Sequence, residues 1–217
     1  MMPRLRDQLE AKRQTMNDEV RRAYEAMVAE LQRTDFLSHA LKVGDRFPDL
    51  VLPNAEGALT SINRLLAEGP LVVTFFRGEW CPYCRLMLDA LAAALPEIRA
   101  LGASLVAITP EAGGRALTAK QNHNAGFEVL CDIDCGVGLN CGVVFRAPEP
   151  YRVLLLKYGT DLAERHGNPS WFLPVPATFV VDRGGTVRWR FISVDFTERA
   201  EPADILAALR SLSAPEG

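Results

Sequence analysis

The sequence predicts an α/β protein whose largely parallel central sheet is closed by an antiparallel hairpin and preceded by helices. Two continuous apolar runs, PLVVTFF (70–76) and ASLVAIT (103–109), have the composition of strands that are buried on both faces. A helical pattern follows each run, and strands that alternate with helices are typical of a parallel sheet. Later in the chain, RGG separates two further strand-like runs, which predicts the hairpin.

The composition excludes several functional classes. The chain has 217 residues, of which 48% are hydrophobic and 24% are charged, and its formal net charge is −3. These values suit one well-buried domain with additions, and they leave no basic surface for nucleic acid or an anionic membrane. No window approaches the ~18 consecutive apolar residues of a membrane-spanning helix. The first residues, MMPRLRDQLEAKRQ, lack the apolar centre of a signal peptide, so we expect a cytoplasmic protein.

Residues 1–40 are predicted to form a helical extension. Their apolar side chains recur mostly three, four or seven positions apart, which is the spacing of an amphipathic helix: Leu5, Leu9, Met16, Val20, Tyr24, Met27 and Leu31. Thr15 followed by Asp18 is a helix-start signal, so we expect two helices. The apolar stripe either packs on the main domain or serves as a dimerisation arm, which leaves a homodimer open.

Residues 41–217 are predicted to form one domain. We expect a loose β-hairpin near its start, then the strand at 70–76, and then a helix that begins after Pro82 and ends near Pro96. The remaining expected elements are the strand 103–109, a helix to about residue 124, a short strand in FEVLCD, an inserted loop or helix at 146–174, the hairpin strands 176–182 and 186–192, and a final helix in EPADILAALRSL.

The stretch FFRGEWCPYCRL places Cys81 and Cys84 at the junction between the first buried strand and the following helix. Pro82 suits the first turn of that helix, where its missing N–H costs nothing. The free N–H groups and the positive dipole end of the helix stabilise an anion at Cys81 and lower the pKa of its thiol from ~8.5. The helical spacing brings Cys84 close to Cys81, so the two are predicted to cycle between dithiol and disulfide, as cytoplasmic disulfides usually do.

A zinc site and an inert pair of thiols are both weaker interpretations of Cys81 and Cys84. A structural zinc site usually has four ligands, but the remaining cysteines are spaced four and six residues apart and the three histidines are scattered. Two inert core thiols would not require Trp80 and Pro82 around them at a helix start. No metal or organic cofactor is therefore expected.

The remaining cysteines, Cys131, Cys135 and Cys141, are interpreted as small apolar core side chains, because cysteine is among the most buried residue types. One of them could instead resolve an intermediate on the pair. Cys135, which Asp134 and Gly136 flank, is the one expected to be exposed.

Arg77 and Glu79 are the charged residues nearest to the pair along the chain. A cation beside the pair would lower the thiol pKa, so Arg77 is a candidate tuning residue. A solvated arginine at the end of a strand is the alternative interpretation.

FFRGEWCPYC resembles the active-site segment of the thioredoxin superfamily. The wider pattern, KVGDRFPDLVLPNAEGALTSI with VPATFVVDRGGTVRW and DFTERAEPADIL, is similar to the peroxiredoxin-like branch of the alkyl hydroperoxide reductase/thiol-specific antioxidant group. The resemblance covers residues 40–212. It implies a thioredoxin-like fold of three layers with a mixed central sheet, and it implies that Pro176, preceded by Val175, is a cis-proline that faces the cysteine pair.

The resemblance implies two different assignments of the pair. Against the peroxiredoxin pattern, Cys84 falls at the peroxidatic position, Cys81 falls where that family has a threonine, and Arg77 falls where it has a proline. Pro176 falls near the position of the family's catalytic arginine, and no arginine is expected at the equivalent place. DFTERAEP is interpreted only as the entry to the last helix. The thioredoxin pattern, in contrast, is complete, with Trp80, Cys81, Pro82, Cys84 and Pro176.

The sequence therefore predicts a thiol-dependent antioxidant oxidoreductase that reduces hydroperoxides through the dithiol and disulfide forms of Cys81 and Cys84. Thioredoxin or another thiol reductant would restore the dithiol. The helix-terminus argument makes Cys81, taken as an exposed thiolate, the first to react, whereas the peroxiredoxin pattern puts Cys84 first. The alternatives are a protein disulfide oxidoreductase with little peroxidase activity, a redox-sensing protein, and a protein that binds copper or zinc through the pair.

Overall fold

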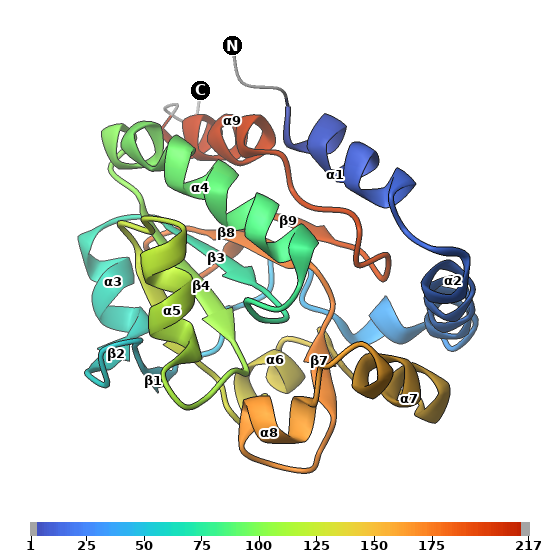
Figure 1. Cartoon of the computed structure of the whole chain (residues 1–217). Coiled ribbons are helices and arrows are strands. Elements are labelled where there is room, and N and C mark those ends of the chain that lie inside the picture. The colour runs from blue at the N-terminus through green and yellow to red at the C-terminus, as the bar shows by residue number, and fades with distance from the viewer. Residues whose placement is uncertain (1–3, 214–217) are drawn as a thin grey trace.

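A five-stranded mixed sheet forms the centre of the computed structural model, which describes residues 4–213 (Figure 1). The strand order is β5-β4-β3-β8-β9. Strands β3, β4 and β5 run parallel to one another, while β8 is antiparallel to both β3 and β9, so the predicted mixed sheet with its closing hairpin is confirmed. The strands span Leu71–Phe75 (β3), Ser104–Thr109 (β4), Glu128–Cys131 (β5), Ala177–Val181 (β8) and Val187–Ile192 (β9).

The middle strand, β3, positions the cysteine pair. All of its residues are buried, as its apolar run predicts for a strand covered on both faces. Its last residue, Phe75, pairs with Ile108 on one side and with Ala177 on the other. The loop that carries the pair therefore leaves the sheet at its centre.

Helix α4 (Pro82–Ala100) follows this loop and continues through Pro96, so the prediction that it ends near Pro96 is wrong. Proline removes one hydrogen bond, to the carbonyl four residues earlier. Pro96 is exposed, so water can hydrate that carbonyl. The turn beyond it buries Ile98 completely, which favours continuation of the helix.

The N-terminal extension forms the two predicted helices, α1 (Leu5–Gln14) and α2 (Asp18–Arg33). Asn17, rather than Thr15, caps α2, because its side chain accepts a hydrogen bond from the N–H of Val20 at 2.9 Å. Helix α1 packs on α4, and α2 packs on α7 (Glu149–Lys157). The apolar stripe is thus largely used within the chain, and its buried members are Leu5, Leu9, Tyr24, Met27 and Leu31.

The segment 146–174 is more ordered than the expected loop or single helix. It contains α7, α8 (Leu162–His166) and β7 (Phe172–Pro174), and β7 pairs with β6 (Val144–Arg146) in a separate small sheet. The other elements are η1 (Phe36–His39), the predicted hairpin of β1 (Val51–Pro53) and β2 (Leu59–Ser61), α3 (Ile62–Glu68), α5 (Arg115–Asn122), α6 (Gly136–Asn140) and α9 (Pro202–Ser213). Among residues 4–213, no helix has the length and apolar character needed to cross a bilayer.

Candidate active site

Cys81 and Cys84 lie where the loop after β3 enters α4. Cys81 is the N-cap residue of α4 and Pro82 follows in its first turn, as predicted. The N–H groups of Cys84 and Arg85 donate to the carbonyl of Cys81 at 3.0 and 3.1 Å. Cys84 therefore lies within the first turn of the helix that Cys81 begins.

The turn between β3 and α4 depends on Gly78. Its φ angle is 136°, and an added Cβ would lie 2.6 Å from the carboxyl carbon of Glu111 and 2.7 Å from the indole ring of Trp80. The carboxylate of Glu111 accepts a hydrogen bond from the N–H of Glu79 at 2.7 Å, and the indole N–H of Trp80 donates to the carbonyl of Arg77 at 3.1 Å. These contacts hold the RGEW segment in one conformation.

Both cysteines of the pair are buried. Cys81 is 1% exposed and Cys84 is 0% exposed, so the expectation of an exposed Cys81 is wrong. Cys81 nevertheless lines a cavity of about 390 Å³, whereas Cys84 does not. In this conformation, a small molecule in the cavity meets only Cys81 of the two.

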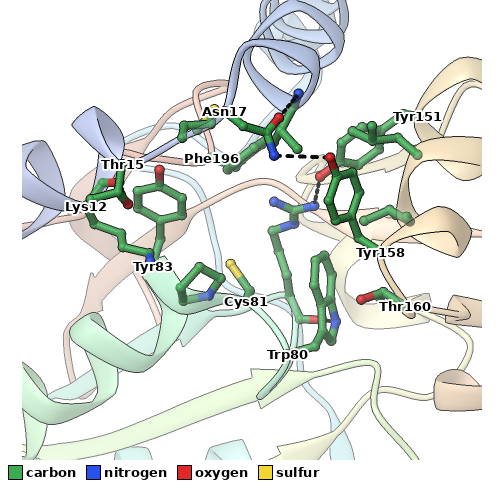
Figure 2. A pocket seen from close by; sticks show the side chains of 16 residues that line it. Lys12, Thr15, Asn17, Trp80, Cys81, Tyr83, Tyr151, Tyr158, Thr160 and Phe196 are labelled. Carbon is green, nitrogen blue, oxygen red and sulfur yellow. Dashed lines mark hydrogen bonds between the residues drawn. The ribbon is translucent and has the colours of Figure 1, made fainter.

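The cavity lies between the start of α4, helix α7 and the segment of residues 5–33. We call this segment the α1–α2 hairpin after its helix–turn–helix order, although α1 packs on α4 rather than on α2. Figure 2 shows Trp80, Cys81 and Tyr83 on the α4 side, with Asn17 and Tyr158 on the facing side. The charged residues that line it are Lys12 and Arg77, both positive. The N-terminal helices thus form part of the cover that hides the pair from solvent, which the local sequence around the pair could not reveal.

Arg77 is 2% exposed, so its interpretation as a solvated arginine is wrong. Its guanidinium donates to the hydroxyl of Tyr151 and lies 4.3 Å from the ring centre of Phe196 and 4.7 Å from that of Trp80. Its backbone N–H points at Sγ of Cys84, 3.4 Å away. The aromatic cage therefore holds a cation beside the pair.

A second arginine, Arg199, contacts the pair from the loop before α9. It is 6% exposed, and it donates to Sγ of Cys84 at 3.0 Å and to the carbonyl of Phe196 at 2.7 Å. Proline still occupies position 176, near which the peroxiredoxin pattern has its catalytic arginine, so Arg199 is a further arginine contact that the sequence analysis did not predict. DFTERAEP does lead into α9, which begins at Pro202, but it also supplies a contact to the reactive pair.

The two buried arginines lack a carboxylate partner among the described residues. The Nε atoms of Arg77 and Arg199 have no hydrogen-bond partner, and within residues 4–213 neither guanidinium forms an ion pair with a carboxylate. A buried cation is costly unless an anion or other partners compensate for the lost water. A thiolate in the cysteine pair is the anion that this arrangement stabilises.

Ionisation is favoured at Cys81, although the direct N–H donors of Arg199 and Arg77 point at Sγ of Cys84. Burial opposes ionisation, but a hydrogen bond from the Cys84 thiol and the charges of Arg77 and Arg199 outweigh it and lower the pKa of Cys81 to about 5. Burial, together with the hydrogen bond to Cys81 and the charge there, raises the pKa of Cys84 well above its ordinary value. The sulfur that lines the cavity is thus the one whose ionisation is favoured.

The structure also corrects the expectation for Pro176. Among residues 4–213 no peptide bond is cis, and Pro176 does not line the cavity. The N–H of Val175 donates to the carbonyl of Val143 at 2.8 Å, and the carbonyl of Pro176 accepts from the N–H of Ser193 at 3.0 Å. Because the chain runs directly from β7 into β8, no tight turn calls for a cis bond.

Cys135 is 2% exposed, so the expectation that it is exposed is wrong. Burial, with the nearby charges of Asp132 and Asp134, raises its pKa to about 12. Burial and Asp132 also raise the pKa of Cys141 to about 12, and burial raises the pKa of the partly buried Cys131. None of the three lines the cavity. Within the described residues, no cluster of three or more His, Cys, Asp or Glu side chains could hold a metal ion.

A comparison with family models identifies the protein's relatives. The model described as the AhpC/TSA family matches residues 43–190, more than half of the chain. The chain belongs to the AhpC/TSA family. This match confirms both the predicted family and the predicted class of activity, a thiol-dependent peroxidase. No curated protein sequence matches this AhpC/TSA member.

Solved structures of AhpC/TSA-type proteins share its fold. The peroxidoxin BcpB from Mycobacterium tuberculosis is 21% identical, with a TM-score of 0.63 over 80% of this chain and 99% of its own. AhpC from the same organism is 15% identical, with a TM-score of 0.62 over 82% of this chain and 96% of its own. A peroxiredoxin-like protein from Aquifex aeolicus is 16% identical, with a TM-score of 0.60 over 80% and 88%. The predicted thioredoxin-like fold is confirmed.

Important parts of the site lie outside the segment that matches the AhpC/TSA model. The α1–α2 hairpin precedes residue 43 and forms one side of the cavity, while Arg199 follows residue 190 and contacts Cys84. Sequence reasoning missed Arg199 because it is separated from Cys84 by 115 positions. One signal could have indicated Arg199. It is the single arginine of DFTERAEP, and it neither continues an apolar pattern nor caps the helix that follows.

Proposed function

We propose that this AhpC/TSA member reduces hydroperoxides with Cys81 as the attacking thiolate and Cys84 as the resolving thiol. The observation that carries the proposal is the placement of Cys81: its pKa is lowered to about 5, and it is the member of the pair that lines the cavity. Cys84 has a raised pKa and no contact with the cavity, which argues against the assignment that puts it first.

In the first step, the thiolate of Cys81 attacks the terminal oxygen of the hydroperoxide. A sulfur–oxygen bond forms and the O–O bond breaks, so the sulfur is oxidised by two electrons to a sulfenic acid and the peroxide is reduced to an alcohol, or to water when the substrate is hydrogen peroxide. The departing oxygen takes a proton from solvent. The guanidinium of Arg77, fully buried beside the cavity, stabilises the negative charge that develops on this oxygen.

In the second step, the sulfur of Cys84 attacks the sulfur of Cys81. An S–S bond forms, and the hydroxyl group leaves as water with the proton that Cys84 gives up. Oxidation of Cys81 assists this step because it removes the charge and the hydrogen bond that raise the pKa of Cys84. The lowering effects of Arg199 and Arg77 then act on Cys84 alone, so the anion moves to the thiol that must react next.

Burial of the pair favours a small peroxide over a protein disulfide as the oxidising substrate. A thiolate must approach a disulfide sulfur directly, and Cys81, at 1% exposure, can be approached only through the cavity. Two electrons from a thiol reductant return the disulfide to the dithiol, and the reductant becomes a disulfide. Its thiolate must reach the buried disulfide as well, so a small thiol enters through the cavity, whereas thioredoxin requires the cover over the pair to open. A cytoplasmic location and a homodimer belong to this proposal as well.

The deciding experiment is stopped-flow fluorescence of the reduced protein mixed with hydrogen peroxide, because Trp80 adjoins the pair and Arg77. We expect a fast, peroxide-dependent first phase in the wild-type protein and in Cys84→Ser, which stops at the sulfenic acid. Cys81→Ser should lose that phase.

A first phase that survives in Cys81→Ser but not in Cys84→Ser would reverse the two roles. A wild-type rate no faster than that of a free thiol would overturn the peroxidase cycle. Reduction of a protein disulfide by the same sample would then support the disulfide oxidoreductase alternative.

A further inference from the structure

The cavity over Cys81 is much larger than hydrogen peroxide requires. Its volume is about 390 Å³, whereas a water molecule occupies roughly 30 Å³ of liquid and hydrogen peroxide has only one more oxygen atom. Cavities of this size are typical of sites that enclose an organic ligand. Hydrogen peroxide would leave most of this volume to water.

The lining of the cavity is mainly apolar. Met16 and Val20 contribute from the α1–α2 hairpin, and Leu154 and Leu155 contribute from α7. Phe196 also lines the cavity, and its ring centre lies 4.3 Å from the guanidinium of Arg77. An apolar group that packs against these side chains would lose contact with water.

The hairpin is fixed to the rest of the protein on both sides of the cavity. At one side, the ammonium group of Lys157 pairs with the carboxylate of Glu19 at 2.6 Å, and the hydroxyl of Tyr158 accepts from the side-chain amide of Asn17 at 3.1 Å. At the other side, the hydroxyl of Tyr24, which is buried, donates to the carboxylate of Asp195. Met16 and Val20, which line the cavity, are therefore held in place as parts of a wall.

We propose that Met16 and Val20 are specificity-determining residues, and that the α1–α2 hairpin makes this protein prefer organic hydroperoxides with a bulky apolar substituent over hydrogen peroxide. This inference rests on the proposed peroxidase cycle. The substituent fills the cavity between the hairpin and α7, and the hydroperoxide group reaches the thiolate of Cys81. The hairpin lies outside the segment that matches the family model, so the preference is a property of this chain's own extension.

The test compares the rate constants for oxidation of Cys81 by cumene hydroperoxide and by hydrogen peroxide, measured by stopped-flow fluorescence. Val20→Phe and Met16→Phe place a ring into the cavity, so the ratio of the cumene hydroperoxide rate to the hydrogen peroxide rate should fall by about tenfold or more, as for a misfit of one or two carbons in an apolar site. Val20→Ala should change this ratio of the two rate constants less than Val20→Phe does.

The matched control is Ala29→Phe, which adds the same side chain to an exposed position of α2 that does not line the cavity. It should leave both rate constants as in the wild type. A ratio that stays within twofold of the wild type in both Val20→Phe and Met16→Phe would overturn the inference.

If the protein is not a peroxidase, the same experiment gives a result that differs from a loss of substrate preference. In that case, both peroxides would oxidise the wild-type protein no faster than they oxidise a free thiol. Because every variant is compared through a ratio, a general loss of folded protein lowers both rates together and is not mistaken for a change in preference.

Discussion

The charge of Arg77 should control the ionisation of Cys81, and replacing it tests the site most directly. The pKa of Cys81 is lowered from 9.0 to about 5, a difference that corresponds to about 5 kcal/mol of preference for the thiolate. Burial opposes this shift, and the Cys84 thiol, Arg77 and Arg199 produce it. An opposite charge close to an ionisable group is typically responsible for roughly 1–3 pKa units. Arg77→Met should therefore raise the pKa of Cys81 to about 6–8.

The effect of Arg77→Met on the ionisation of Cys81 depends on pH. At pH 6, the thiolate fraction of Cys81 should fall from about nine tenths to between about one half and one hundredth. The reaction of the pair with iodoacetamide should slow in the same proportion, and the difference should disappear at alkaline pH, where both proteins are ionised. The assay is the pH dependence of alkylation together with the ultraviolet absorbance of the thiolate.

Arg85→Met is the control for this experiment. Arg85 lies on α4 and pairs with Glu79, but its side chain is 52% exposed and its charge is not among the main causes of the shift of Cys81. It should leave the titration of Cys81 unchanged. An Arg77→Met protein that is folded, by circular dichroism, and still titrates within about half a unit of the wild type would refute the role of Arg77.

Two further predictions concern the second step and the core. Arg199→Met removes the donor to Sγ of Cys84, so the sulfenic acid on Cys81 should persist about tenfold longer or more. Dimedone trapping with mass spectrometry measures this lifetime. An unchanged lifetime would argue against a role of Arg199 in resolution. Phe179→Ala should destabilise the protein by about 3–5 kcal/mol in urea unfolding, because Phe179 is fully buried and packs against the rings of Phe47 and Phe75; a loss below about 1 kcal/mol would contradict that packing.

The strands and the N-terminal helices could be predicted from the sequence because their signals are local. A continuous apolar run identifies β3 and β4, and the helical periodicity of the extension identifies α1 and α2. The end of α4 could not be predicted in this way. Whether Pro96 stops a helix depends on whether its face meets water or the core, and that is decided by the packing of the whole helix.

Only part of the chemistry of Cys81 and Cys84 could be predicted from the sequence. The Cys81–Pro82 helix start predicted the direction of the pKa shift of Cys81. The main causes of that shift, however, are the Cys84 thiol and the charges of Arg77 and Arg199, and the backbone N–H of the helix start contributes less. The burial of Cys81 depends on a hairpin more than sixty residues earlier, and the contact from Arg199 comes from the other end of the chain. Contacts between such distant segments leave no periodicity or spacing in the sequence from which they could be read.

The two buried arginines also bear on the reduction potential of the pair. A disulfide between Cys81 and Cys84 carries no charge, so on oxidation Arg77 and Arg199 keep their burial and lose the anion that faces them. Electrostatics therefore stabilise the dithiol relative to the disulfide, and a couple whose reduced form is stabilised is the more oxidising one. A thiol donor of modest reducing power is then sufficient to regenerate the enzyme, and the peroxide, as a strong oxidant, still drives the forward reaction.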